Sequence, residues 1–229
     1  AHLLDVGAGP GTVTADLAQR VARVTATEIG EAELNLTRAP IVERGVTNVD
    51  FRVADVHQLP FDDDTFDVTH AHQVLQHVTD PVQALREMAR VTRPGGIIAV
   101  RDSDYSAFTW WPAAPQLDEW LRLYLDAARA NGGEPDAGRR LLGWAHAAGL
   151  DDVEAGSSTW CFANEADRAW WGGMWADRIV DSGIARQLVD SGAATPADLR
   201  EIREAWLHWA AHPDGWFSIL HGEILCRVR

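Results

Sequence analysis

Lysine is absent from the 229-residue sequence, and all 20 cationic residues are arginines. The chain therefore has no side chain that could form a Schiff base and no Walker-type phosphate-binding lysine. Cysteine is scarce: Cys161 and Cys226 lie far apart without metal-ligand spacing, which is typical of buried thiols in a cytosolic protein. No apolar run reaches the roughly 20 residues that a membrane-spanning helix needs, and no signal peptide is visible.

Basic residues are fewer than acidic ones, 20 against 34, so the formal net charge is -14 at pH 7. This balance argues against nucleic acid and anionic membranes as partners, because phosphate groups are bound by clustered cations. It suits a cationic ligand. The length is that of one domain with a sizeable insertion. Because Ala1 lies directly in the first predicted strand, we expect the natural protein to carry a further N-terminal segment.

Apolar runs alternate with helix-like segments from residue 1 to about 105, which is typical of βαβ units. The second half is expected to be richer in helix, and residues 165–211 are predicted to be helical with a break near 192–196. We expect a single domain over 1–229 with a cap of about 163–214 inserted before the last strand. Strands are predicted near 2–6, 24–28, 49–54, 66–70, 97–100, 151–160 and 216–228, and helices near 12–21, 31–44, 81–92, 115–130 and 138–148.

A glycine-rich turn follows the first predicted strand. In LLDVGAGPGT, over residues 3–12, an acidic residue precedes three glycines at every second position. Glycine lets the backbone turn sharply and lets a ligand approach it closely. A strand, a glycine turn and a helix start together form a nucleotide cradle. The spacing is G-x-G-x-G, however, and not the G-x-G-x-x-G of dinucleotide-binding proteins; taken alone it also suits a tight strand-to-helix connection.

Polar residues end the next three predicted strands. Glu28 lies 17 residues after Gly11 and could accept both hydroxyls of a ribose. Asp55 could accept from the exocyclic amine of adenine, with Val56 packed on the ring. The segment 71–78 follows the fourth strand. Because open α/β sheets bind ligands at the carboxyl ends of their strands, these positions share one edge. Each also has a plainer interpretation, as a solvated strand end or a turn cap.

Residues 3–102 resemble the class I S-adenosylmethionine (SAM)-dependent methyltransferases, in particular the ubiquinone and menaquinone C-methyltransferases and related small-molecule enzymes. The resemblance implies an α/β fold: a Rossmann-like, seven-stranded, mostly parallel sheet with an antiparallel C-terminal strand. The segments that carry it are LLDVGAGPGT (3–12), Glu28, ADVHQLPFDDDTFD (54–67), HQVLQHVTDP (72–81) and RVTRPGGIIAV (90–100).

The resemblance also implies the cofactor and its contacts. SAM would be the methyl donor and S-adenosylhomocysteine (SAH) the product. Asp5 would orient the glycine loop or reach the ligand ammonium through water. The residues expected to bind the cofactor are Asp5, Gly7, Ala8, Gly9, Glu28, Ile29, Asp55, Val56, His72 and Gln73.

Methyl transfer from a sulfonium proceeds by in-line displacement, so alignment of donor and acceptor can supply much of the acceleration. A base is needed only for some acceptors, such as a hydroxyl. The candidates for catalysis are His77, Asp102 and Tyr105. For each of them a structural or solvated role is an equally open interpretation.

All eleven tryptophans lie between Trp110 and Trp216. Core packing of a helical cap would explain them, and so would a dimer interface. A third interpretation is an aromatic pocket for the methyl acceptor. The residues proposed for that pocket are Trp110, Trp111, Trp171 and Trp175.

The histidine pattern does not predict a metal site. His70, His72 and His77 lack a suitable ligand spacing, and the pair His208 and His212 lacks a third ligand. We therefore expect a cytoplasmic SAM-dependent methyltransferase, monomeric or homodimeric, that acts on a small, partly apolar or aromatic molecule without metal, nucleic acid or membrane. The alternatives are a nicotinamide-dependent oxidoreductase and a non-catalytic binding or regulatory protein with this fold.

Overall fold

The computed structural model describes residues 1–229. The chain forms two compact units. Unit 1 comprises Ala1–Asp102, Ala137–Ser157 and His221–Arg229, and unit 2 comprises Ser103–Asp136 and Ser158–Leu220. Strands β5 (Thr92–Ser103), β7 (Val153–Phe162) and β8 (Trp216–Arg227) have residues in both units.

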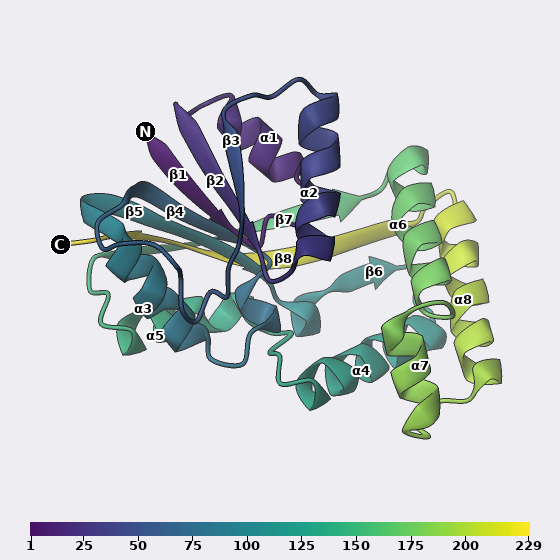
Figure 1. Cartoon of the computed structure of the whole chain (residues 1–229). Coiled ribbons are helices and arrows are strands. Elements are labelled where there is room, and N and C mark those ends of the chain that lie inside the picture. The colour runs from purple at the N-terminus through teal and green to yellow at the C-terminus, as the bar shows by residue number, and fades with distance from the viewer. The chain divides into compact units, whose positions relative to one another are not determined.

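Unit 1 contains a parallel sheet (Figure 1). β1 pairs with β2 on one side and with β4 on the other, β2 pairs with β3, and β4 pairs with β5, all in parallel. The remaining strands of this unit are β1 (His2–Val6), β2 (Arg23–Glu28), β3 (Val49–Val53) and β4 (Phe66–His72). Its helices are α1 (Thr12–Ala18), α2 (Glu31–Glu43), α3 (Pro81–Val91) and α5 (Leu141–Ala147), with the short turns η1 (Leu75–His77) and η3 (Gly138–Arg140).

The core of unit 1 is built from strand residues and from the apolar faces of its helices. Leu4 of β1 and Ile98 of β5 are fully buried, and Leu85 and Met88 lie one turn apart on the buried face of α3. Leu3 and Val24 pack with Ala18 of α1 in a separate cluster. Burial of these side chains from both faces explains why the strands carry continuous apolar runs.

The sequence Arg93–Gly96, which precedes the strand predicted near 97–100, lies inside β5 as an irregular segment. Phe66 pairs with Thr92 and Val68 pairs with Ile97, so the register with β4 shifts across these residues. Gly95 has φ +80°, a backbone conformation that glycine adopts without a steric penalty. The turn-forming sequence thus produces a bulge within β5.

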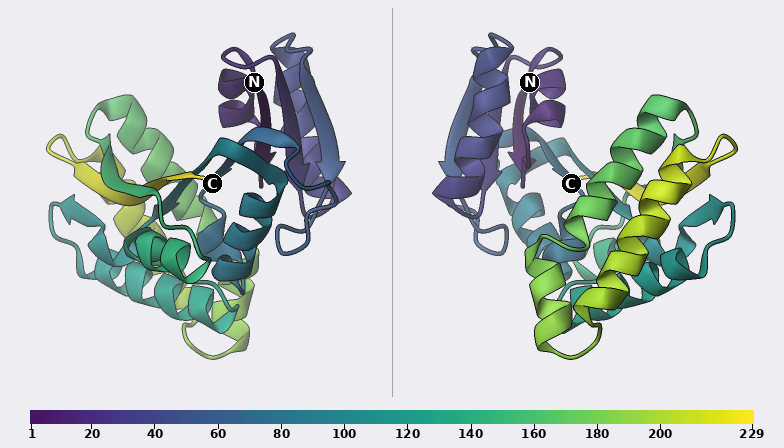
Figure 2. Two further views of the ribbon diagram at one scale, coloured as in Figure 1. Left: turned by 90° about the vertical axis from the view of Figure 1, so that its left-hand side faces the viewer. Right: turned by 90° about the vertical axis from the view of Figure 1, so that its right-hand side faces the viewer.

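Unit 2 contains helices packed around a core of aromatic residues. The helices α6 (Glu165–Arg178) and α8 (Pro196–Ala211) lie side by side (Figure 2). Gly172 of α6 permits this approach, since a Cβ there would lie 2.7 Å from the Cβ of Ala210. The other elements are η2 (Tyr105–Ala107), β6 (Thr109–Trp111), α4 (Pro115–Ala130) and α7 (Gly183–Asp190). β6 pairs antiparallel with β8.

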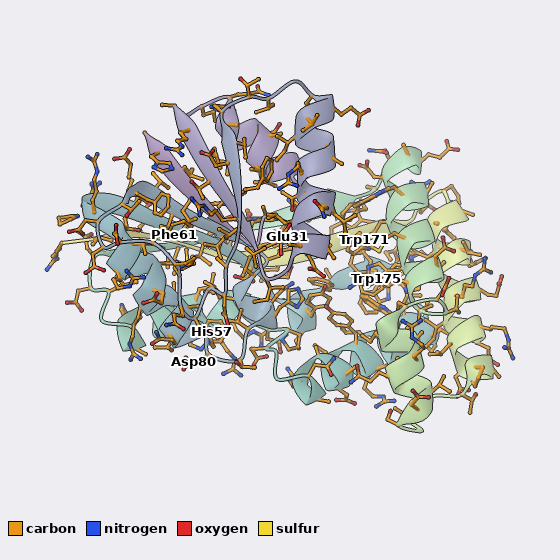
Figure 3. The ribbon with its side chains drawn as sticks, in the orientation of Figure 1. Glu31, His57, Phe61, Asp80, Trp171 and Trp175 are labelled. Carbon is orange, nitrogen blue, oxygen red and sulfur yellow. The ribbon has the colours of Figure 1, made fainter.

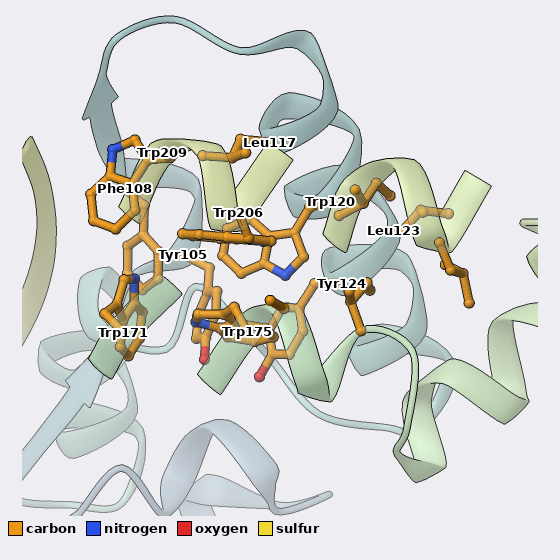
Figure 4. Packing of buried hydrophobic residues seen from close by; sticks show 14 of the residues in the cluster. Tyr105, Phe108, Leu117, Trp120, Leu123, Tyr124, Trp171, Trp175, Trp206 and Trp209 are labelled. Carbon is orange, nitrogen blue, oxygen red and sulfur yellow. The ribbon is translucent and has the colours of Figure 1, made fainter. Parts of the chain in front are cut away.

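Most indole pairs in the aromatic core of unit 2 pack edge to face, whereas Trp175 and Trp206 are stacked. Trp120 meets Trp175 at a centroid distance of 4.5 Å and an interplanar angle of 73°, and Trp206 at 4.9 Å and 87° (Figure 4). Phe217 of β8 contacts several of these rings and is fully buried. Edge-to-face packing is the arrangement that the charge distribution of aromatic rings favours.

The predicted fold class is confirmed: the fold is α/β with a mostly parallel sheet, an antiparallel C-terminal strand and helices α6, α7 and α8 before it. Eight strands take part instead of seven, in the order β3-β2-β1-β4-β5-β8-β6, with β7 beside β8. The strand missing from the prediction is β6. The helical segment also breaks a second time, where the side chain of Ser182 accepts the N–H of Ala185 and starts α7. No helix has the length and apolar character needed to cross a membrane.

Candidate cofactor site in unit 1

The glycine turn joins β1 to α1 with a left-handed backbone. Gly7, Gly9 and Gly11 have φ of +60°, +56° and +76°. A Cβ on Gly7 would lie 2.7 Å from a methyl of Val74, and one on Gly11 would lie 2.4 Å from the carbonyl oxygen of Thr37. A Cβ on Gly9 would meet no atom within 4 Å. Gly7 and Gly11 are therefore fixed by their protein neighbours, whereas the space at Gly9 is open to a ligand.

Glu28, at the end of β2, lies against this turn. Its Oε1 accepts the N–H of Gly9 at 2.5 Å. The side chain of Thr37 in α2 donates to the Gly9 carbonyl oxygen at 2.6 Å. Ala8, which is buried, donates its N–H to the carbonyl oxygen of Thr27 at 3.0 Å. The carboxylate predicted to bind a ribose is thus beside the one glycine of the turn that is open to a ligand.

Asp5 is buried below the turn. Its two carboxylate oxygens interact with different elements: Oδ2 accepts from the hydroxyl of Thr14 in α1 at 2.6 Å, and Oδ1 lies 2.8 Å from Nδ1 of His70 in β4. Asp5 thus links β1 to α1 and to β4. Its two predicted roles, orientation of the glycine loop and contact with the ligand ammonium, stay predictions.

Asp55 and Glu28 lie at the ends of adjacent strands. Glu28 is paired with Val53 of β3, and the N–H of Ala54 donates to the Glu28 carbonyl oxygen at 2.9 Å. Hydrogen bonds from the backbone N–H and from the ring of His57 lower the pKa of Asp55 below its ordinary value. The two carboxylates that the sequence predicted to act together are therefore on one edge of the sheet.

Apolar side chains flank these carboxylates in two different ways. Ile29, next to Glu28, is 64% exposed, which is unusual for such a side chain at a strand end. Val56, next to Asp55, is buried with Leu59 in the core of unit 1. Val56, the residue expected to pack on the adenine ring, is thus buried, whereas Ile29, which was predicted to bind the cofactor, has an exposed face.

The segment after β4 is held from several sides. Gln73 has φ +56°, uncommon for a residue other than glycine. Its N–H donates to the carbonyl oxygen of Arg101 at 2.7 Å, and its Nε2 lies 2.9 Å from Nε2 of His221 in β8. The N–H of Gln76 donates to Oδ1 of Asp102 at 3.0 Å. Backbone strain of this kind persists only where the surroundings fix it, and it concentrates at functional sites.

Three imidazole rings line up next to Gln73. The ring of His72 lies 6.5 Å from that of His70 and 6.3 Å from that of His221, with interplanar angles of 3° and 22°. Burial, reinforced by the positive charge of Arg101, lowers the pKa of His72 to about 4. His72 is therefore neutral at neutral pH. His70 and His221 were not predicted as site residues. The contact of His70 with Asp5 depends on the pairing of β4 with β1, and the contact of His221 with Gln73 depends on the position of β8, which is distant in sequence.

The three predicted catalytic residues have different environments. His77 lies in η1, is exposed, and has its Nε2 3.0 Å from Nε2 of Gln76. Asp102 is fully buried, and burial raises its pKa to about 7. Tyr105 belongs to unit 2, where its ring stacks on Tyr124 at 4.3 Å and burial raises its pKa well above the ordinary value. Of the three, only His77 has an exposed side chain.

The four tryptophans predicted to line an acceptor pocket belong to unit 2. Trp171 and Trp175 are 7% and 1% exposed and are part of its core. Trp110 is half-buried and stacks on Phe217 at 5.5 Å. Trp111 is 60% exposed. No group of three or more His, Cys, Asp or Glu side chains is placed to hold a metal ion.

Residues 4–100 match the methyltransferase domain family. The sequence is 34% identical to an uncharacterized methyltransferase, C1B3.06c, of Schizosaccharomyces pombe, over 98% of this chain and 83% of that protein. The chain belongs to the class I SAM-dependent methyltransferases.

Two further similarities each cover less than half of the other protein. The ubiquinone/menaquinone biosynthesis C-methyltransferase UbiE of Idiomarina loihiensis is 40% identical over 43% of this chain and 41% of its own length. Phosphoethanolamine N-methyltransferase 2 of Haemonchus contortus, solved with phosphomonomethylethanolamine and SAH, is similar in structure with a TM-score of 0.61. That match covers 100% of this chain and 49% of the other, at 14% identity, and so shows the shared fold.

Proposed function

We propose that this methyltransferase transfers the methyl group of SAM to a small, partly apolar or aromatic molecule. The observation that carries the proposal is the open space at Gly9 beside the carboxylate of Glu28. A left-handed glycine whose Cβ position is empty lets a ligand approach the backbone. Glu28 engages the turn through Oε1, which leaves Oε2 for ribose hydroxyls.

The described residues fit SAM along the edge of the sheet in unit 1. Glu28 would hold the ribose, Asp55 the adenine amine, and Ile29 would pack on the adenine ring. Gln73 and His72, at the end of β4, would lie toward the amino-acid end of the ligand. When bound, SAM supplies a methyl group on a cationic sulfur, which passes to the acceptor by in-line displacement.

The charges of this edge favour a cation. Asp5, Glu28 and Asp55 are acidic, and His72 is neutral at neutral pH because burial lowers its pKa to about 4. A neutral imidazole near the sulfonium avoids the repulsion that an imidazolium would cause. The chain's contribution to catalysis would be alignment of the two reactants, which requires no metal and no covalent intermediate.

An acceptor that must lose a proton would need a base, and we propose His77 for that role. It is the exposed member of the three predicted candidates. Asp102 is enclosed and holds the backbone of Gln76, whereas Tyr105 is packed among aromatic rings. These contacts make Asp102 and Tyr105 better suited to structural roles.

The acceptor class rests on two observations. The matching UbiE relative is named for ubiquinone and menaquinone biosynthesis, and unit 2 carries a partly exposed aromatic surface that includes Trp111. Indoles bind apolar and aromatic molecules through large, rigid faces. We propose Trp110 and Trp111 as acceptor contacts, since Trp171 and Trp175 are occupied by core packing.

The test is calorimetry with SAM and SAH on Glu28→Ala. Loss of hydrogen bonds to a charged group should weaken binding by about 1.5–3 kcal/mol. Glu43→Ala, at the exposed end of α2, is the matched control and should bind as the parent does. Equal affinity of the Glu28→Ala variant and the parent would show that Glu28 does not contact the ligand.

The two alternative functions predict other results. Fluorescence titration with NADH would show saturable binding by a nicotinamide-dependent oxidoreductase. A methyl-donor consumption assay with a panel of quinols, phenols and amines separates an enzyme from a binding protein, because only the enzyme converts SAM to SAH. Membership of the methyltransferase family favours methyl transfer over both alternatives.

A further inference from the structure

His57 connects two segments of unit 1 through both of its ring nitrogens. Nδ1 lies 2.7 Å from Oδ1 of Asp55, and Nε2 accepts the backbone N–H of Asp80 at 3.3 Å. Figure 3 shows His57 beside Asp80, the residue that precedes α3. The side chain of Gln83 adds a third link, donating to the His57 carbonyl oxygen at 3.2 Å.

These partners define the tautomer of His57. The pKa of Asp55 is lowered, chiefly by the hydrogen bond from the backbone N–H of His57, so its carboxylate is ionised and can only accept. Nδ1 must therefore carry a hydrogen. Because Nε2 accepts the N–H of Asp80, it carries none. The ring is thus the neutral Nδ1–H form, with a donor facing Asp55 and an acceptor facing α3.

This arrangement leaves the Asp55 carboxylate with one occupied and one available oxygen. Oδ1 receives both the backbone N–H and the ring N–H of His57, at 2.9 and 2.7 Å. No protein group donates to Oδ2, and the Asp55 side chain is 53% exposed. Two donors on one oxygen fix the plane of the carboxylate, and α3 fixes the ring that supplies one of them. Oδ2 is therefore an oriented acceptor that faces solvent.

We propose that His57 is a positioning residue that makes the cofactor site selective for adenine over 6-oxopurines, by holding Asp55 so that Oδ2 accepts the exocyclic amine. The proposal rests on the proposed function, because it assumes that SAM occupies the edge formed by Glu28 and Asp55. A 6-oxopurine presents a carbonyl oxygen where adenine has the amine, and a carboxylate cannot donate to it. Selectivity then depends on how firmly the carboxylate is held.

Calorimetry with SAH and with S-inosylhomocysteine, its 6-oxopurine analogue, tests this proposal. The parent should prefer SAH by about tenfold or more, as expected for one hydrogen bond to a charged group. Three substitutions separate the contacts of His57. Alanine removes both contacts of the ring. Asparagine keeps an N–H near the position of Nδ1, and glutamine extends to the position of Nε2 without a donor toward Asp55.

We expect His57→Ala and His57→Gln to lose about fivefold or more of the preference for SAH, and His57→Asn to keep it within about twofold. The backbone N–H of residue 57 donates to Asp55 in every variant, but only asparagine also keeps a side-chain N–H toward that carboxylate. The ratio of the two affinities is the informative quantity, because general damage to the site weakens both ligands alike. His146→Ala, an exposed histidine of α5, is the control and should match the parent.

The outcomes are distinct. Failure of the parent to bind SAH would overturn the proposed function. Binding of SAH by the parent with an unchanged preference in His57→Ala would overturn the role of His57 alone. Should His57→Ala not fold, as judged by thermal unfolding, the comparison of His57→Asn with His57→Gln decides, and equal preferences in those two variants would also overturn it.

Discussion

In unit 1 the buried carboxylate of Asp5 is hydrogen-bonded on both oxygens, by Thr14 and His70. In unit 2, four buried indole N–H groups have no hydrogen-bond partner, those of Trp120, Trp171, Trp175 and Trp206. An unsatisfied buried donor normally costs about 1–3 kcal/mol. The edge-to-face ring pairs of unit 2 offset part of that cost, because aromatic pairs stabilise beyond their buried area.

The difference indicates separate structural requirements. At the edge proposed for the cofactor in unit 1, Asp5, Glu28 and Asp55 accept hydrogen bonds that fix particular oxygen atoms, as a polar ligand requires. The aromatic residues of unit 2 fill volume, and the packing of their faces matters more than the position of any one polar atom. Substitutions in unit 1 should therefore alter ligand affinity and pH dependence, whereas those in the core of unit 2 should alter stability.

Trp175→Ala tests the packing half of this comparison and should have the largest effect on stability. Trp175 is 1% exposed and contacts the rings of Trp120 and Tyr124. Removal of a buried indole costs about 3–5 kcal/mol, through lost burial and the cavity left behind. Urea unfolding followed by circular dichroism measures it.

The control for this substitution is Trp170→Ala, on the same helix but 61% exposed. We expect it to cost less than about 1 kcal/mol, as is usual for exposed sites. Similar losses from the two variants would show that the indole cluster is not a packed core, and would favour its interpretation as a pocket for the acceptor.

Asp102→Asn tests the part of the comparison that concerns polar residues of unit 1, through the dependence of stability on pH. Burial raises the pKa of Asp102 to about 7, from 3.8. The folded state thus holds a proton that the unfolded state has released between about pH 4 and 7, so this group lowers stability as the pH rises through that window. The full effect is roughly 4 kcal/mol. Asparagine cannot ionise and should remove it.

We therefore expect Asp102→Asn to gain stability relative to the parent between pH 4.5 and pH 8, in urea titrations at each pH. Oδ1 of the asparagine can still accept the N–H of Gln76, so the loop after β4 should keep its anchor. A difference between variant and parent that does not change with pH would mean that Asp102 is not the titrating group.

The elements around the cofactor site could be predicted because local sequence determines them. Residues 3–12 contain the strand, the left-handed turn and the helix start in one segment, and the parallel strand order places Glu28 and Asp55 on one edge. The bond between His57 and Asp80, and that between Gln73 and His221, depend on packing between distant segments. No local pattern indicates such partners.

The misses in unit 2 have a similar cause. β6 has three residues, too few for an alternating pattern, and is a strand only because Thr109–Trp111 pairs with β8. The positions of the tryptophans in the sequence could not distinguish a packed core from a pocket. Trp171 and Trp175 are buried, whereas Trp110 is half-buried and Trp111 is exposed. This difference depends on tertiary packing, which the sequence pattern does not show.

Gly9→Ala should change stability less than Trp175→Ala or Asp102→Asn and should have a large effect on binding. The added Cβ meets no atom within 4 Å, so the cost to folding is the left-handed conformation of alanine, about 1–2 kcal/mol. The same methyl group would occupy the space proposed for SAM and should weaken SAH binding by about tenfold or more, a cost of roughly 1.4 kcal/mol or above.

Gly45→Ala is the matched control, because Gly45 also has a positive φ, +68°, and an empty Cβ position but lies after α2, away from the turn. Both variants pay the same backbone cost, so their difference in SAH affinity isolates the contact with the ligand. Equal affinities in calorimetry would mean that the opening at Gly9 is ordinary solvent-exposed surface. Cofactor recognition would then have to depend on Glu28, Asp55 and the segment after β4.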